Sequence, residues 1–137
     1  MPPRPLRRPA APPAHKRSAR AATGRRGEEL AAAHLRRLGF TILDRNVRTR
    51  YGEIDLVACD PLVLAFVEVK TTRGASVAPL ERVGRAQRAR VRRLALSWMM
   101  GRPPGSFRRA QVRFDAIGVV LDRDGALLAL EHVEGAW

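Results

Sequence analysis

The chain is poor in cysteine, histidine and long apolar runs. Cys59 is its one cysteine, which excludes an internal disulfide and argues against an exported, disulfide-stabilised fold. The three histidines are scattered, without the spacing of a zinc site. No apolar run is long enough to span a membrane, and none follows the basic N-terminus as the core of a signal peptide would. We therefore expect a cytoplasmic protein that does not enter a membrane.

Acidic residues and lysine are also scarce. The chain has 13 acidic and 26 basic side chains, for a formal net charge of +13, and only Lys16 and Lys70 among the basic residues are lysines. A charge of this sign favours a polyanionic partner, nucleic acid first and an anionic membrane second. Arginine spread over a solvated surface would account for part of the same charge.

The length of the chain allows one domain with a sizeable core. Residues 1–22 are rich in proline, arginine and alanine and show no apolar periodicity. We expect them to form a disordered basic tail that adds non-specific attraction to phosphates. Residues 23–137 then form the single folded domain.

Apolar periodicity predicts two helices and five strands in the order α-β-β-β-α-β-β. The first helix begins after a Thr23 cap and carries Leu38 on its inward stripe, and a loop follows Lys70 over 71–78. The expected helices are about 24–38 and 79–100, and the expected strands are 40–47, 52–58, 62–69, 111–121 and 126–133.

The candidate site lies in the hairpin between Tyr51 and Lys70. Alternation in its first strand places Ile54 with Leu56 and Ala58, and Asp55 on the other face. If the loop has an even length, for example with Ala58 opposite Val63, then Asp55, Glu68 and Lys70 project from one face. Two carboxylates at diagonal positions can hold one hard divalent cation. An odd loop would separate the two acids.

The same residues could be ordinary polar side chains at the exposed end of a sheet. Two features favour a site. Lys70 is one of only two lysines, and a compact ammonium fits beside a metal-bound water where a planar guanidinium does not. The acids also end a buried strand, where charge is unfavourable unless it is paired or bound to metal.

Other polar residues have two readings each. Glu28 could reach the metal site from the first helix, or could simply be stabilised by the helix dipole. Gln87, in the apolar stripe of the second helix, is a structural bridge or part of the site. Asp115 is expected to support Arg113 or another basic group. The arginines predicted to contact phosphates, or else to be merely solvated, are Arg48, Arg50, Arg73, Arg85, Arg88 and Arg92.

These motifs resemble the YraN-like family of small bacterial proteins over residues 24–133. The matching residues are Gly24, Gly27-Glu28, Arg45-Asn46, Gly52-Glu53-Ile54-Asp55, Phe66-Val67-Glu68-Val69-Lys70, Gln87 and Arg113-Phe114-Asp115. That family is similar to the PD-(D/E)xK nucleases, including the archaeal-type Holliday-junction resolvases. The chain departs from the pattern at Ile54, where proline is usual, and at Ala86, where relatives commonly carry a basic residue.

The resemblance implies an α/β restriction-endonuclease-like fold, with a central mixed sheet flanked by helices. It implies that Asp55, Glu68 and the Val69 carbonyl bind Mg²⁺ (or Mn²⁺). Lys70 would position or activate water, and Glu28 and Gln87 would line the pocket. The implied activity is hydrolysis of DNA, more than of RNA, with branched or flapped structures as candidate substrates. A non-catalytic nucleic-acid-binding module, an accessory protein of a repair or ribosome-associated complex, and a homodimer all stay open.

Overall fold

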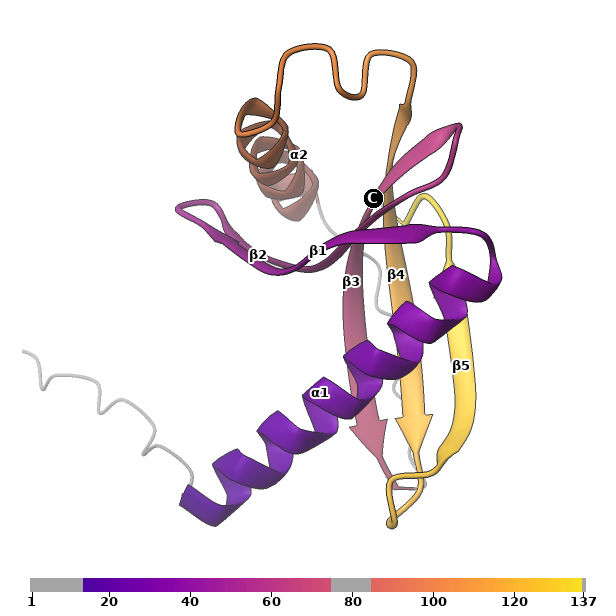
Figure 1. Cartoon of the computed structure of the whole chain (residues 1–137). Helices are drawn as coiled ribbons and strands as arrows, with labels where there is room; N and C mark the ends of the chain where they lie inside the picture. Colours follow the sequence, from indigo (N-terminus) through magenta and orange to yellow (C-terminus); the bar gives the residue numbers. More distant parts are fainter. Residues whose placement is uncertain (1–13, 75–84, 137) are drawn as a thin grey trace, which may run out of the picture.

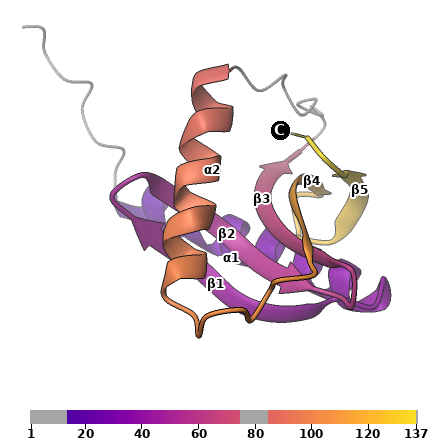
Figure 2. The ribbon, with the colours of Figure 1, turned by 90° about the horizontal axis from the view of Figure 1, so that it is seen from above.

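The computed structural model describes residues 14–74 and 85–136, with the side chains of 14–19 and 85–88 left outside the description. It is an α/β fold in which one five-stranded sheet carries a helix on each face (Figures 1 and 2). The predicted order of elements is confirmed. The elements are α1 (Ala14–Arg37), β1 (Thr41–Thr49), β2 (Gly52–Cys59), β3 (Val63–Arg73), α2 (Arg85–Met100), β4 (Gln111–Leu121) and β5 (Leu127–Val133).

The sheet is mixed, as predicted, with the strands in the order β1-β2-β3-β4-β5. All neighbours are antiparallel except β3 and β4, which run parallel without a register shift from Val63↔Gln111 to Arg73↔Leu121. A parallel pair needs a crossover connection, and α2 lies within it. Within the described residues, no helix is both long and apolar enough to cross a membrane.

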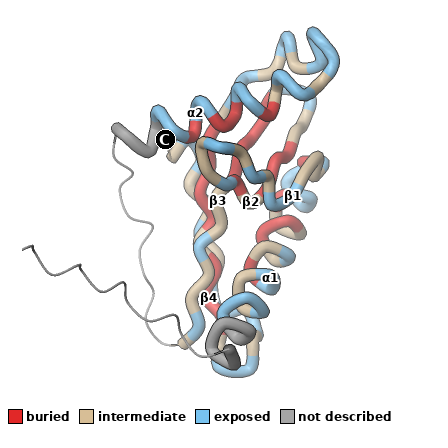
Figure 3. The backbone as a smooth tube through the Cα atoms, turned by 90° about the vertical axis from the view of Figure 1, so that its left-hand side faces the viewer, coloured by how far each residue is buried: buried red, intermediate tan, exposed pale blue. Residues whose placement is uncertain are grey.

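Strand β3 is the centre of the core because both of its faces are covered. Ala65 and Val67 pack in the cluster under α1, whereas Leu64 and Phe66 pack in the cluster under α2. All four are buried, which explains why this strand reads as a continuous apolar run. Figure 3 shows the buried residues gathered along the strands and the inward sides of both helices.

Helix α1 begins earlier than expected. Its first residue is Ala14, so the predicted start after a Thr23 cap is wrong. No glycine or proline occurs from Ala14 to Thr23, and alanine and arginine favour helix there. Residues 14–22, assigned to the tail by composition, are therefore helical, while residues 1–13 lie outside the description. Leu38 is 50% exposed rather than inward, because the helix ends before it at Arg37.

Strand β3 is also longer than expected. It runs to Arg73, so the predicted loop is wrong at its first three residues. Thr71 and Thr72 are β-branched and pair with Val119 and Val120 of β4, which extends the strand. The rest of that loop and the predicted start of the second helix at Pro79 fall in 75–84, outside the described residues.

Strand β2 changes face at Asp55. Leu56 and Ala58 lie under α1 as a pair, but Ile54 packs in the α2 cluster, so the prediction that all three share a face is wrong. The cause lies in β1, where Asn46 stands between the partners of Ile54 and Leu56 and has a left-handed φ of 49°. Such a residue twists the strand pair locally, and the twist turns the end of β2.

Candidate active site

The register of β2 and β3 places the two predicted acids side by side. Ala58 pairs with Ala65, so the expected pairing with Val63 is wrong by two residues. The loop keeps an even length, because Cys59 pairs with Leu64. The β2–β3 ladder ends at Leu56↔Val67, and Asp55 and Glu68 are the next residues along the two strands. The two acids are close together there, because the charge of Glu68 raises the pKa of Asp55.

The shifted register has a local cause in the turn. The Asp60 carboxylate accepts the backbone N–H groups of Leu62 and Val63 at 2.8 and 2.7 Å. The Asp60 N–H in turn donates to the Val63 carbonyl at 3.0 Å. These bonds hold Asp60 to Val63 as a tight turn, so the strand pairing begins at Cys59 and Leu64.

The three central side chains surround one segment of β3. The Asp55 Oδ2 atom accepts the Val69 N–H at 2.7 Å, in the place where the β2–β3 ladder has ended. The Lys70 Nζ lies 3.0 Å from the Glu68 Oε1. The Glu68 side chain is 24% exposed and that of Lys70 is 66% exposed, so the acid is sheltered and the ammonium faces solvent. Two carboxylates and one ammonium therefore meet where the pairing of the two inner strands β2 and β3 ends.

Asp55 is poorly stabilised in its charged form. Burial raises its pKa, and the neighbouring Glu68 carboxylate raises the pKa further. The Val69 N–H and Lys70 lower it, but the net pKa stays above the ordinary aspartate value. A carboxylate held in this state would be stabilised by a cation, which is the usual condition of a vacant metal ligand or a catalytic acid.

Glu28 joins this group from α1. Burial raises the pKa of its carboxyl, and the charge of Asp55 raises it next. A hydrogen bond from the Asn46 side chain acts in the opposite direction. By strand alternation Val69 faces α1, together with Glu28, while Glu68 and Lys70 belong to the α2 face. Asp55 stands between the two sets, because its charge raises the pKa of Glu28 and its own pKa is raised by the charge of Glu68.

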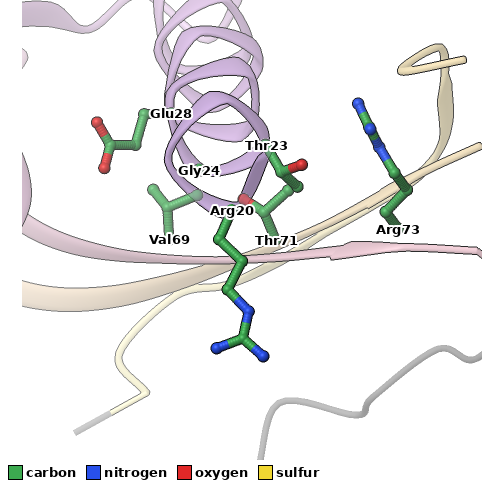
Figure 4. Close-up of a pocket in the computed structure, with 7 residues that line it drawn as sticks. All are labelled: Arg20, Thr23, Gly24, Glu28, Val69, Thr71 and Arg73. Atoms are coloured by element: carbon green, nitrogen blue, oxygen red, sulfur yellow. The ribbon is translucent and has the colours of Figure 1, made fainter. Parts of the chain in front are cut away.

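A pocket of about 550 Å³ opens beside Glu28, between α1 and β3. In Figure 4, Glu28 and Val69 stand at one end and Arg73 at the other. The lining residues are Arg20, Thr23, Gly24, Glu28, Val69, Thr71 and Arg73. Sequence reasoning missed Arg20 and Thr23, because both were placed outside the first helix. Their signal is the spacing of Arg20, Gly24 and Glu28 on one helical face.

The donor atoms suit a hard divalent cation. Asp55 and Glu68 offer carboxylate oxygens, which Mg²⁺ prefers over nitrogen and sulfur. Across residues 14–74 and 85–136, no group of three or more His, Cys, Asp or Glu side chains could hold a metal ion. A bound cation would therefore rest on the two carboxylates, with main-chain oxygen such as the Val69 carbonyl and water completing its coordination. Mg²⁺ commonly binds through one or two carboxylates.

The described members of the predicted phosphate-contacting arginines lie at the β1–β2 turn, at the pocket and on α2. Arg48 pairs with Glu53 at 2.7 Å, and Arg50 donates to the Tyr51 hydroxyl, both at the β1–β2 turn. Arg73 lines the pocket. On α2, Arg92 is exposed, and the missed Arg90 lies beside Gly52, which brings it to the β1–β2 turn. The side chains of Arg85, Gln87 and Arg88 lie outside the description.

Asp115 belongs to a separate buried network. It is fully buried, and its oxygens accept Arg113 Nε at 2.8 Å and Nη2 at 2.9 Å, so the expectation that it supports Arg113 is confirmed. His132 Nε2 lies 2.8 Å from the Asp115 Oδ2, and His132 Nδ1 lies 3.0 Å from the His34 Nε2. Burial alone would raise the pKa of Asp115, but the bonds from His132, Arg113 and the Gly135 N–H lower it overall. The network ties α1 to β4 and β5.

Comparison with known proteins decides the family. Residues 27–119 match the Uncharacterised protein family UPF0102. The chain belongs to this family. UPF0102 is the YraN-like family that the motifs resemble, and its matched segment spans Gly27 to Val119, including Asp55, Glu68, Lys70 and Asp115.

Individual UPF0102 relatives align over most of this chain. The UPF0102 protein of Acidothermus cellulolyticus is 43% identical over 128 residues, covering 88% of this chain and 96% of the relative. That of Nocardia farcinica is 48% identical over 117 residues, covering 85% and 89%. That of Anaeromyxobacter dehalogenans is 50% identical over 101 residues, covering 73% of each chain.

Proposed function

We propose that this UPF0102 protein is a Mg²⁺- or Mn²⁺-dependent nuclease that hydrolyses phosphodiester bonds in DNA. The observation that supports the proposal is the closeness of three groups: Glu68 lies near enough to raise the pKa of Asp55, and the Lys70 Nζ lies 3.0 Å from Glu68. The raised pKa of Asp55 supports it, because the charged carboxylate lacks the stabilisation that a cation would supply. Ordinary polar side chains at the exposed end of a sheet would not require two neighbouring carboxylates in a partly buried position.

Each residue of the site has a distinct role in the proposal. When bound, the metal ion would lower the pKa of a water molecule and neutralise charge on the scissile phosphate. Asp55 and Glu68 would hold the ion. Lys70, anchored by Glu68, acts as a charged hydrogen-bond donor to the attacking water or the phosphate. Glu28, whose pKa is raised, holds or accepts a proton on the α1 side of Asp55.

The substrate and setting follow from charge. The net charge of +13 attracts a polyanion, and we assign DNA over RNA on the likeness to the nuclease superfamily. Branched or flapped DNA is the proposed substrate class. The proposal includes a cytoplasmic location, and a homodimer if both strands of a branch are cut, since symmetric cuts need two sites.

The test is a titration of Mg²⁺ or Mn²⁺ against linear, flapped and four-way DNA. Asp55→Ala and Glu68→Ala should abolish metal-dependent cleavage, and circular dichroism should show an intact fold. Asp124→Ala, which removes an exposed acid in the β4–β5 turn, serves as the matched control and should cleave at the parent rate. If Asp55→Ala also cleaves at the parent rate, the assignment is wrong.

A binding module without turnover is the second candidate. It is favoured by the contacts that already satisfy the acids, since Asp55 accepts the Val69 N–H and Glu68 pairs with Lys70. Such a protein would bind nucleic acid with steep salt dependence and no need for divalent metal. Failure to cleave any of the three DNA forms, together with metal-independent binding, would select this function over the nuclease.

A further inference from the structure

We propose that the pocket between α1 and β3 binds the sugar-phosphate backbone of one unpaired nucleic-acid strand, next to the site of cleavage. This subsite deepens the proposed function and rests on it for the identity of the substrate. Its evidence is separate, because none of Asp55, Glu68 and Lys70 lines the pocket. Val69 and Glu28, which do line it, connect it to those residues.

The chemistry of the lining suits phosphate. Arg20 and Arg73 supply two positive charges, and Thr23 and Thr71 supply hydroxyl donors. Among the described contacts neither arginine forms an ion pair with an acid of the chain, so both guanidinium groups are available to a ligand. Guanidinium and hydroxyl groups are common partners of phosphate oxygens. Glu28 is the one acid among the described lining residues, and it lies at the opposite end from Arg73 and close to Asp55.

The lining also indicates that the pocket does not recognise particular bases. Among the lining residues that the structure describes, none has an aromatic side chain on which a base could stack. None of these described residues is an asparagine or glutamine that could read a base edge. Contacts to phosphate and sugar alone carry no sequence information. We therefore expect binding that is indifferent to base sequence.

The size of the pocket selects a single strand. A volume of about 550 Å³ is that of a small-ligand site, which accepts one nucleotide unit and excludes a duplex. Glu28, at one end of the pocket, is close enough to Asp55 for their charges to interact, so a strand held in the pocket lies beside Asp55. This arrangement explains why an unpaired flap or branch would be preferred over linear duplex.

Two glycines of α1 shape the pocket in different ways. At Gly27 an added Cβ would lie 1.8 Å from the Thr71 Oγ1, so glycine is needed for the helix to approach β3. At Gly24 an added Cβ would meet nothing within 4 Å, so this position opens into free space. A larger side chain at Gly24 would therefore occupy the pocket without displacing the helix.

The experiment measures binding of a fluorescent oligothymidylate and an oligodeoxycytidylate in EDTA, by anisotropy over a series of salt concentrations. Arg20→Ala and Arg73→Ala should each weaken binding roughly tenfold, equally for both sequences. Each should reduce the slope of log K against log salt by about 0.7. Gly24→Leu should weaken binding as strongly with the net charge unchanged. It should also remove the preference for the single strand over the same sequence in a duplex.

The matched control is Arg36→Ala, an exposed arginine of the same helix that does not line the pocket. It should weaken binding less than twofold, as expected for diffuse attraction. Equal losses for Arg20→Ala and Arg36→Ala, or parent affinity for Gly24→Leu, would overturn the subsite. Because EDTA removes divalent metal, these results do not depend on cleavage. A subsite that behaves as expected in a protein that cuts nothing would leave the binding proposal standing and refute the nuclease.

Discussion

Two aspartates, Asp55 and Asp115, occupy opposite electrostatic environments. The pKa of Asp55 is raised, chiefly by burial and then by the adjacent Glu68, against the opposing Val69 N–H. The pKa of Asp115 is lowered, because bonds from His132, Arg113 and a backbone N–H outweigh its burial. A raised pKa means that the folded state disfavours the charged form, and a lowered pKa means that it stabilises that form. The first is typical of a functional acid and the second of a structural one.

Neutral isosteres of the two aspartates should therefore shift stability in opposite directions. Asp55→Asn removes an unfavourable charge and keeps an oxygen that can accept the Val69 N–H, so we expect the Tm at neutral pH to rise by roughly 3 °C. Asp115→Asn leaves Arg113 without its buried partner and should cost about 3 kcal/mol of unfolding free energy. Differential scanning calorimetry measures both. A fall in Tm for Asp55→Asn would mean that this carboxylate is structural.

The same two shifts set the acid dependence of stability. The stability that Asp115 contributes is present above its unfolded pKa of about 3.9 and is lost as pH falls through its lower folded pKa. Asp55 acts in reverse, since its raised folded pKa makes stability increase as pH falls through that value toward about 3.9. Urea unfolding across this range should therefore show a steep acid loss in the parent protein. That loss should be flatter in Asp115→Asn and unchanged in the Asp124→Ala control.

At the scale of elements, helix α1 is positioned on β3 by one close contact. Gly27 is buried and lies against Thr71, and the residue after it is Glu28. The distance between the helix and the strand therefore also sets where the Glu28 carboxylate lies. A small residue at this crossing is a packing requirement, because any Cβ would enter the Thr71 side chain.

Alanine at the two glycines of this crossing should act in opposite directions. Gly27→Ala forces α1 away from β3 and should reduce the unfolding free energy by about 2 kcal/mol. Thr71→Ala in the same chain should recover part of this loss, because it removes the nearest atom. Gly24→Ala, one turn earlier, meets no neighbour and should stabilise the helix by up to about 1 kcal/mol. Chemical denaturation gives all three values, and a neutral Gly27→Ala would contradict the crossing.

The sequence predicts elements best where the pattern is long and local. Strands β4 (Gln111–Leu121) and β5 (Leu127–Val133) match their expected ranges to within a residue, because an Asp-Gly turn separates two apolar runs. The start of α1 is missed because alanine and arginine continue a helix that composition assigns to a tail. The end of β3 is missed because Thr71 and Thr72 become strand only when β4 pairs beside them.

The sequence predicts which residues belong to the candidate site better than it predicts how they are arranged. Parity alone predicts Asp55, Glu68 and Lys70 on one side, and the loop is even as expected, but the change of face in β2 leaves Asp55 between the two sides. The shift of the β2–β3 register by two residues depends on the hydrogen bonds of the Asp60 turn, and apolar periodicity in the sequence does not predict these bonds. Arg20 enters the pocket only because α1 is longer than expected, and the buried bond between His34 and His132 joins residues too distant in sequence to be paired by inspection.

At the scale of the whole molecule, binding and chemistry have separate origins. The basic residues are spread over the tail, the helices and the turns, whereas Asp55 and Glu68 lie together on the inner strands β2 and β3. Attraction to nucleic acid therefore depends on many arginines and little on any one acid. Cleavage, in the proposed function, depends on Asp55 and Glu68.

Binding should consequently survive the loss of a site acid. Asp55→Ala removes a negative charge near the proposed path of the strand, so we expect its affinity for single-stranded DNA in EDTA to equal or exceed that of the parent, by up to about threefold. Cleavage in Mg²⁺ should be lost in the same preparation. Anisotropy and gel assays on one sample measure both, and a large loss of affinity in EDTA would show that Asp55 maintains the fold of the binding surface.

The parallel pairing of β3 with β4 also has a consequence for how the chain is made. Every acid of the site precedes α2, but the strand that flanks β3 over its whole length follows it. During synthesis the side of β3 that pairs with β4, from Val63 to Val67, has no partner strand until Gln111–Leu121 has left the ribosome. An exposed edge of this kind is prone to intermolecular association. We therefore expect chains truncated before β4 to aggregate rather than persist as partly active fragments. The folded site and resistance to aggregation would then both depend on the pairing of β4 with β3.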